Sequence, residues 1–484
     1  MKKKFILNLI LLIILNILIK PYYVFFIDRT AQNLVGAQEY GFYFAILNFT
    51  FVINIILDMG LVNYNNRYIA QNPTLLKQVF PPLVTLRLVL GVIYCLVGFF
   101  IAVLMGYRTR QFQMLGILLF NQFLLSFILY LRSNISGLMK FTTDSIISVI
   151  DKLILCVICT VMFLNTRLKL NFKIEWFVYA QTISYLITAL IAFIIVAKDS
   201  SFKKLEWDTK LFKKVLIKSL PYAILPILMS FYYRIDMVLL SNLIPGATGE
   251  TYVGVYAHSF RIIEALNNFA YLFAVLLLPL FARLISENES VHEYVRLSTN
   301  FLVVFVFTFV TIIFYYALPI IDVLYKEEIE LSAKVFNILI FSLPGMALSY
   351  VYGTLLTANG SLKKLNTIAF IGMILNVSLN LLLIRKYNVI GSAISSVVAH
   401  TTVITIQIIT VVKMFDFNIN LKVISNKLLF IISLYIIGFL ILKYVPFEWY
   451  YKLLLHIFVA IFLSLIFKLV NLKGLVKLIK SDEE

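Results

Sequence analysis

The stretch KSLPYAILPILMSFYYRIDMVLLSNL (218–243) decides the fold, together with GVYAHSFRIIEALNNF (254–269), which follows after a short polar break. Both segments belong to apolar runs long enough to cross a bilayer, and each carries an arginine where a membrane normally excludes charge. Arg234 lies sixteen residues after Lys218, about 24 Å along a helix and inside a hydrocarbon core of about 30 Å. Arg261 lies about 10 Å down the returning helix, so we expect the two guanidinium groups at one level.

Charged side chains inside a membrane normally face the interior of a helix bundle or a watery cavity. We therefore predict a cationic cavity that contains Arg234 and Arg261. Lys20, beside Pro21, lies sixteen residues after Lys4 and is expected at a matching depth, with a kink at the proline. The alternatives are snorkelling of these side chains to the headgroups, or internal pairs of Arg234 with Asp236 and of Arg261 with Glu264.

Composition defines the class of protein. Of the 484 residues, 61% are hydrophobic and 14% are charged, and the mean hydropathy is +0.95. Apolar runs of membrane-spanning length recur along the chain, which predicts an all-α polytopic membrane protein. We expect fourteen spans, at 5–27, 41–64, 80–105, 111–136, 142–164, 175–197, 215–243, 254–282, 297–320, 332–357, 364–385, 389–413, 427–445 and 449–470.

The formal net charge of +18 does not indicate nucleic-acid binding, because Lys and Arg concentrate in alternate loops. That bias predicts a multi-pass protein with both termini in the cytoplasm. The expected parts are an N-terminal lobe (1–197, spans one to six), a cytoplasmic interfacial linker helix (198–214), a C-terminal lobe (215–415, spans seven to twelve) and a last part (416–484) with two further spans and an amphipathic tail.

A weak internal repeat supports the two halves. Tyr40-Gly41-Phe42-Tyr43 opens the second span and Val253-Gly254-Val255-Tyr256 opens the eighth. Ser136-Gly137-Leu138-Met139-Lys140 ends the fourth span and Asn359-Gly360-Ser361-Leu362-Lys363 ends the tenth. Parallel repeats of this kind build transporters that rock around a central site.

Four more charges fall inside predicted spans and are candidate coupling or gating residues, as are Asp236 and Glu264. Asp58 and Arg87 are interpreted as a structural pair or a cytoplasmic gate. Asp151 and Lys152 are neighbours about 100° apart on a helix, so we expect them not to pair well with each other and one to find a partner on another span. His258 is interpreted as a hydrogen-bonded packing residue.

We expect no enzyme and no cofactor. The chain has no phosphate-binding Gly-Lys-Ser/Thr loop and no HExxH motif. Its three cysteines lie in apolar helices, where they suit packing better than metal or redox chemistry.

The segments quoted above, with LDMGL (57–61) and TANGSLKKLNTIAFIGMILNVSLNLLLIRKYNVIGSAISSVVAH (357–400), resemble the polysaccharide transporter family. These are the Wzx-type O-antigen flippases of the multidrug/oligosaccharidyl-lipid/polysaccharide (MOP) exporter superfamily. The resemblance covers essentially the whole chain. It implies two six-helix lobes in a MATE-like V with two further C-terminal helices, and a basic cavity in which Lys20, Arg234 and Arg261 match by helix and depth.

The resemblance also implies the activity, which is translocation of an undecaprenyl-pyrophosphate-linked oligosaccharide to the periplasmic leaflet of a bacterial inner membrane, for lipopolysaccharide or another surface polysaccharide. Expected partners are this lipid-linked substrate, membrane lipids and other polysaccharide-assembly proteins. Two alternatives remain open: a cation-coupled multidrug exporter of the same superfamily, and a non-transporting scaffold of a glycan-assembly complex.

Overall fold

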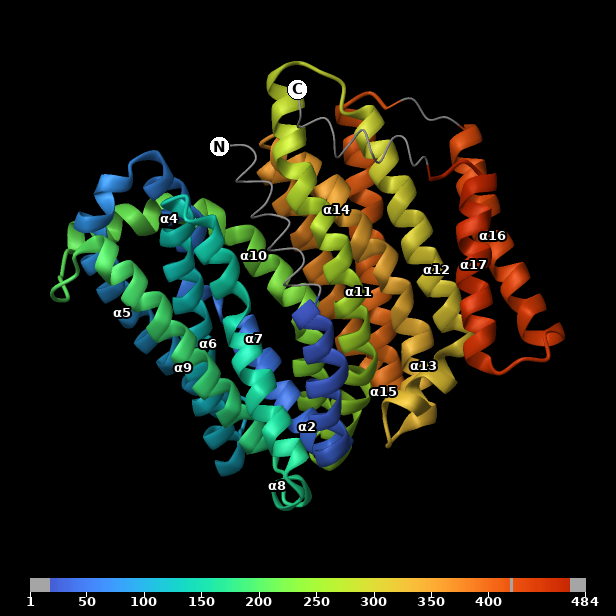
Figure 1. The fold of residues 1–484 in the computed structure, drawn as a ribbon, viewed down its shortest axis with the longest axis horizontal. Coiled ribbons are helices and arrows are strands. Elements are labelled where there is room, and N and C mark those ends of the chain that lie inside the picture. Colours follow the sequence, from blue (N-terminus) through green and yellow to red (C-terminus); the bar gives the residue numbers. More distant parts are fainter. Residues whose placement is uncertain (1–17, 418–420, 471–484) are drawn as a thin grey trace. The chain divides into compact units, whose positions relative to one another are not determined.

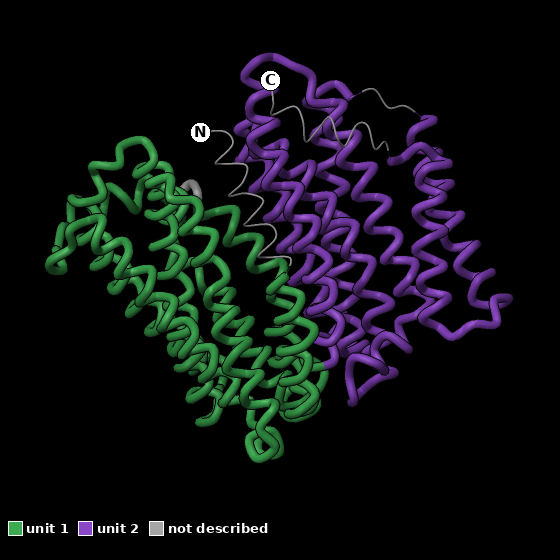
Figure 2. The backbone as a smooth tube through the Cα atoms, in the orientation of Figure 1, with its two compact units in different colours: residues 1–254 green, residues 255–484 purple. Residues whose placement is uncertain are grey.

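The computed structural model describes residues 18–417 and 421–470. They form two compact units, residues 1–254 and 255–484 (Figure 2). Unit 1 holds η1 (Tyr23–Asp28), α2 (Arg29–Val52), α3 (Ile55–Asp58), α4 (Leu61–Gln71), η2 (Pro73–Leu75), α5 (Leu76–Leu104), α6 (Thr109–Gly137), α7 (Phe141–Leu164), α8 (Thr166–Leu170), α9 (Ile174–Ser200), α10 (Thr209–Leu243) and the start of α11 (Ala247–Ser286). Figure 1 labels most of these helices.

Unit 2 is also helical in the part of the chain that the structure describes. It contains the rest of α11, then α12 (His292–Leu324), α13 (Ile329–Leu339), η3 (Ile340–Ser342), α14 (Leu343–Ala358), α15 (Leu362–Met414), α16 (Leu421–Tyr444) and α17 (Trp449–Ile466). The prediction of an all-α membrane protein is therefore confirmed.

The predicted spans coincide with helices. Among the described residues, eleven helices are long and apolar enough to cross a membrane, or twelve if the bent pair 18–52 and 55–71 counts as one. One of these helices, α15, contains two predicted spans, 364–385 and 389–413. α15 changes direction at Asn388 (φ 51°), so that Gly391 lies against the carbonyl of Leu383. Near Gly36 (φ 84°) the chain also reverses, because the Tyr40 hydroxyl reaches Asp28, twelve residues earlier.

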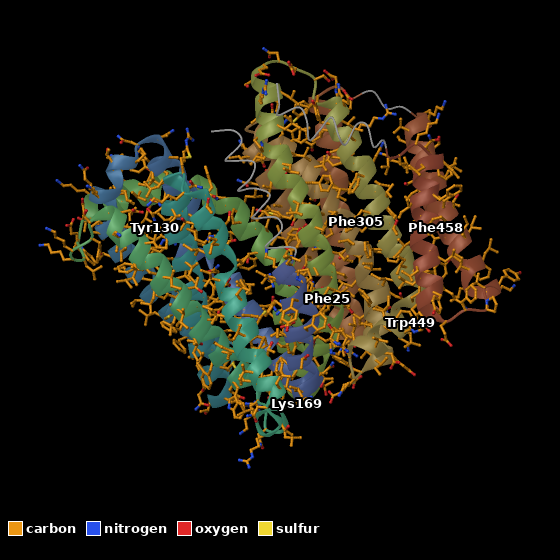
Figure 3. All side chains as sticks on the ribbon, viewed as in Figure 1. Phe25, Tyr130, Lys169, Phe305, Trp449 and Phe458 are labelled. Atoms are coloured by element: carbon orange, nitrogen blue, oxygen red, sulfur yellow. The ribbon has the colours of Figure 1, made fainter. Side chains whose placement is uncertain are left out.

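Apolar side chains fill the cores of the two units and also lie on the outer faces of the helices. Figure 3 shows all described side chains. The core of unit 1 includes Phe80, Tyr130 and Leu131, none more than 1% exposed. On α17, by contrast, Phe458 is 68% exposed. An apolar surface of this kind is stable against lipid tails and not against water.

The predicted second span, 41–64, is broken in the structure. α2 ends at Val52, α3 runs only from Ile55 to Asp58, and α4 begins at Leu61 after Met59 and Gly60, which both have positive φ. The break frees backbone carbonyls inside an apolar bundle, where each needs another hydrogen-bond donor.

The repeated motif marks a close helix crossing in unit 1. A Cβ atom at Gly41 would overlap the carbonyl of Glu250, and one at Gly254 would overlap that of Ala37. The hydroxyl group of each motif tyrosine also forms a hydrogen bond with a polar side chain on another helix of its own unit. Tyr43 accepts a hydrogen bond from Gln181 of α9 at 2.9 Å, and the Tyr256 hydroxyl lies 2.9 Å from that of Ser396 on α15.

The prediction that residues 198–214 form one linker helix is wrong. α9 continues to Ser200, residues 201–208 are not helical, and α10 begins at Thr209 with Asp208 as its N-cap. α10 packs against α2 and α4, which places it in unit 1, and the boundary between the units falls at Gly254. Residues 1–17 and the tail 471–484 lie outside the described residues, and so do most of the first predicted span and of the amphipathic tail.

Candidate functional site

Arg234 lies on α10, nine residues before the end of this membrane-spanning helix. Its Nη1 donates to Asn48 Oδ1 at 3.2 Å, and its Cζ lies 4.5 Å from the centre of the Phe51 ring. Asn48 is fully buried, and its own Nδ2 donates to the Phe44 carbonyl, which turns Oδ1 toward the arginine. These two contacts position the guanidinium group.

Lys20 belongs to the same unit as Arg234. It is exposed and lies on the helix that is described from residue 18 onward. Directly after Pro21 and Tyr22 lies η1, six residues of π-helical geometry. The kink expected at Pro21 itself stays a prediction. π-Helical segments are rare in proteins, and those that occur often lie at functional sites.

Arg261 lies on α11 in unit 2, and its Nη1 contacts Glu264 Oε2 at 3.1 Å. This is the internal pair that the sequence left open as an alternative. The two side chains are only 11% and 27% exposed, so the glutamate partly neutralises the arginine where it lies. That Arg261 shares one cavity with Arg234 and Lys20 stays a prediction.

Arg87 and Asp58 form a pair at the break in the second span. Arg87 is 3% exposed and donates to Asp58 Oδ1 at 3.1 Å and to the carbonyl of Leu57 at 2.6 Å. It also contacts Ser126 and the ring of Tyr130. Asp58 in turn accepts the amide of Val62 in the first turn of α4. The pair therefore joins the two ends of the broken helix.

The prediction that Asp151 and Lys152 do not pair is wrong. Lys152 Nζ lies 3.4 Å from Asp151 Oδ2, because the flexible lysine side chain bends back around the helix. The expected partner on another span is present as well. Lys152 contacts the hydroxyl of Tyr185 on α9 at 3.3 Å, and its Nζ lies 5.0 Å from the centre of the Tyr23 ring.

Two further residues of the predicted spans are fully buried. Asp236, on α10, is 1% exposed. His258, on α11, is 2% exposed; its Nδ1 lies 2.8 Å from the Ser332 hydroxyl and its ring stacks on Tyr325. The interpretation of His258 as a hydrogen-bonded packing residue agrees with this geometry.

Sequence reasoning missed Asp28, which it placed just beyond the first span. Asp28 is 1% exposed and lies inside the helix, where its carboxylate accepts a hydrogen bond from Tyr40 at 2.9 Å. It also missed Asn48 and Phe51, which hold Arg234. For Asn48, the available signal was that a polar residue lies within the apolar segment YGFYFAILNFTF (40–51).

Two family models match the chain. The model described as "Polysaccharide biosynthesis protein" matches residues 6–285, more than half of the chain. The MatE model matches residues 221–382. A comparison with curated proteins found no match.

Solved structures show the same fold. The chain is similar to the lipid II flippase MurJ in an inward closed conformation, with a TM-score of 0.71 and 16% identity over 98% of this chain and 99% of that one. It is also similar to an inward-facing multidrug resistance MATE family transporter of the MOP superfamily (TM-score 0.61, 13% identity, 83% and 98% covered). A mutant Vibrio cholerae MATE transporter gives a TM-score of 0.55 at 14% identity, with 85% and 96% covered.

The family model spans the part of the chain that carries Lys20, Arg234 and Arg261, and the MurJ structure shares the fold of this chain along nearly its full length. This chain therefore belongs to the polysaccharide biosynthesis protein family.

Proposed function

We propose that the protein is a flippase that moves an undecaprenyl-pyrophosphate-linked oligosaccharide across a bacterial inner membrane, from the cytoplasmic to the periplasmic leaflet, by alternating access. The glycan is an O-antigen or another surface-polysaccharide repeat unit. Both termini lie in the cytoplasm, and the substrate is supplied and used by other polysaccharide-assembly proteins in the same membrane. The family and the fold support transport of this kind.

The observation that carries the proposal is the setting of Arg234. A sugar diphosphate cannot enter hydrocarbon alone, because its charges and hydroxyls would lose their hydrogen bonds. Arg234 lies within a membrane-spanning helix, and an amide oxygen and an aromatic face orient it. A guanidinium group held in this way offers charge-assisted, bidentate hydrogen bonds to a phosphate. Lys20 and Arg261 are proposed as the further cations of the site.

The test is transport by the purified protein in proteoliposomes. Arg234→Glu and Arg234→Ala are expected to slow flipping of the lipid-linked oligosaccharide at least about tenfold, the effect of one lost charge-assisted hydrogen bond. Arg283→Ala is the control, because Arg283 is 62% exposed and pairs with Glu287 near the end of α11. In cells, the Arg234 variants should lose surface glycan and accumulate the lipid-linked precursor.

The same measurement separates the alternatives. A scaffold would show no flipping in proteoliposomes that contain only this protein, although its loss would still reduce surface glycan. A cation-coupled drug exporter would move organic cations, and Arg234→Glu would leave that activity unchanged or increase it. Normal flipping of the lipid-linked oligosaccharide by Arg234→Glu would remove Arg234 from the site.

A further inference from the structure

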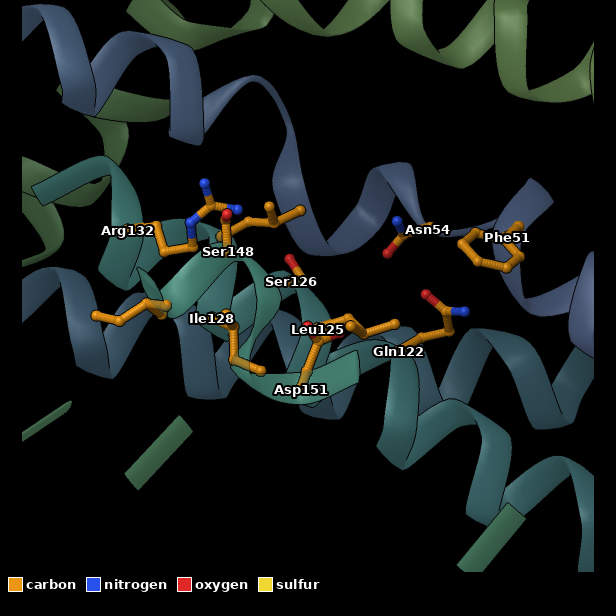
Figure 4. Close-up of a pocket in the computed structure, with 11 residues that line it drawn as sticks. Phe51, Asn54, Gln122, Leu125, Ser126, Ile128, Arg132, Ser148 and Asp151 are labelled. Carbon is orange, nitrogen blue, oxygen red and sulfur yellow. The ribbon is translucent and has the colours of Figure 1, made fainter. Parts of the chain in front are cut away.

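Unit 1 contains a cavity of about 160 Å³ between α2, α6 and α7 (Figure 4). Asn54, Gln122 and Phe51 lie at one end of it, Arg132 and Ser148 lie at the other, and Ser126 lies between them. The Asp151 carboxylate also lines the cavity. The lining thus combines two amides, two hydroxyls, a carboxylate, a guanidinium group and an aromatic ring with aliphatic side chains.

Two amide groups in this lining have unused hydrogen-bonding capacity. Gln122 is 1% exposed, and its Nε2 has no hydrogen-bond partner among the residues that the structure describes; the same is true of Asn54 Oδ1. Buried amides without partners are rare in native proteins, since each loses its bonds to water and gains none. One unused donor and one unused acceptor at the same end of a cavity indicate a polar occupant.

The charges around the cavity are compensated. Arg132 pairs with Asp144 at 2.7 Å, and Asp151 lies 3.4 Å from Lys152. A bound ion would disturb these pairs, whereas an uncharged ligand rich in hydroxyl groups would not. The size agrees with a single ring, because a cavity of about 150 Å³ holds a molecule of benzene.

The cavity adjoins the proposed diphosphate site. Phe51 lines the cavity, and the guanidinium group of Arg234 lies over the same ring. We propose that this cavity binds one sugar ring, the one joined directly to the diphosphate of the lipid-linked substrate. Phe51 offers its ring face to the sugar, and Asn54, Gln122 and Asp151 bind its hydroxyl groups. This inference rests on the proposed function, since it assigns a subsite next to Arg234.

The experiment compares binding of undecaprenyl pyrophosphate, without sugar, with binding of the same lipid carrying one glucose, galactose, N-acetylglucosamine or N-acetylgalactosamine. The full chain in nanodiscs is expected to bind at least one sugar-bearing lipid about tenfold more tightly than the sugar-free lipid. Gln122→Leu, which removes the unused donor, should abolish that preference without weakening binding of the sugar-free lipid. Arg234→Ala should weaken binding of both lipids by the same factor.

Two further variants keep the test independent of folding. Leu125→Phe fills the cavity and leaves every polar group in place, so it should also abolish the preference. Asn121→Leu is the matched control: this neighbouring amide is buried and bonds the Val178 carbonyl outside the cavity, so the preference should persist.

The possible outcomes separate the two proposals. Equal binding of the sugar-free and all sugar-bearing lipids, with no binding of a free monosaccharide, would overturn the sugar subsite alone and assign the cavity to about five waters, at about 30 Å³ each. A preference that survives both Gln122→Leu and Leu125→Phe would place the sugar elsewhere and overturn it too. Binding of a free monosaccharide without discrimination between the lipids would assign the cavity to a soluble sugar. Failure to bind any of the lipids would remove the proposed function, and the subsite with it.

Discussion

At the scale of single residues, Arg87 shows how a charge inside a membrane protein serves the fold. It satisfies the Leu57 carbonyl that the helix break exposes, and it neutralises Asp58 beside that break. Arg87→Met would leave the Leu57 carbonyl without this donor and the Asp58 carboxylate without its counter-charge. We expect the free energy of unfolding to fall by about 3 kcal/mol. This value is near the lower end for removal of one partner of a buried ion pair, because Asp58 is 28% exposed.

The thermal unfolding midpoint of the purified protein in detergent measures this loss. The double variant Asp58→Asn with Arg87→Met should recover part of the midpoint, because the uncompensated carboxylate is gone. An unchanged midpoint in Arg87→Met would show that the arginine does not support the break.

Most charged residues inside the membrane-spanning helices could be found from the sequence. Only some of their partners could be. Asp58 and Arg87, in the inner parts of adjacent spans, could each be interpreted as a member of a structural pair or a gate, and the structure shows that they pair with each other. Asp28 could not, since nothing in the sequence shows that the helix continues past Ile27 or that the chain turns back near Gly36 to bring Tyr40 beside it. Asn54 and Gln122 are two polar residues among many, and only packing shows that they meet at one cavity.

At the scale of helices, the glycines of the repeated motif set how closely α2 and α11 approach. A methyl group at Gly41 or Gly254 would overlap a backbone carbonyl of the other helix, so the helices would have to move apart. We expect Gly41→Ala and Gly254→Ala each to destabilise the protein by about 2 kcal/mol, as overpacking does elsewhere, and to lower transport.

Gly116→Ala on α6 is the matched control. The nearest atom to a Cβ at Gly116 is Phe99 Cζ, at 3.5 Å, which is ordinary van der Waals contact. This variant should unfold at or slightly above the wild-type midpoint, because alanine favours helix more than glycine does. If all three variants behaved alike, the crossing at Gly41 and Gly254 would not depend on close approach.

Hydropathy predicted where the helices lie, because burial in lipid needs an apolar run of fixed length. It did not predict the irregular geometry inside them. The turn at Asn388 falls between two predicted spans, where it was expected. The break between Val52 and Leu61 is stabilised by Arg87 on α5, a contact between spans that hydropathy does not show. Hydropathy also did not show that residues 201–208 are not helical.

At the scale of the whole molecule, the proposal needs a defined orientation, because a flippase must receive its substrate on the side where it is made. α9 is long enough to cross the membrane, because its 27 residues measure about 40 Å, more than a hydrocarbon core of about 30 Å. Its two ends therefore lie on opposite sides. Lys169, in α8 before its start, and Lys204, after its end, are both exposed and therefore report opposite surfaces (Figure 3 shows Lys169).

The orientation predicted from the positive charges places Lys169 outside and Lys204 in the cytoplasm. In a background with Cys95, Cys156 and Cys159 replaced by alanine, Lys169→Cys should react with a membrane-impermeant maleimide in intact cells. Lys204→Cys should react only after the inner membrane is permeabilised. The reverse pattern would invert the protein, place both termini outside and leave the proposed direction of transport without its basis. Matching reactivity in detergent shows that both thiols are accessible, so a difference in cells reports the membrane and not local packing.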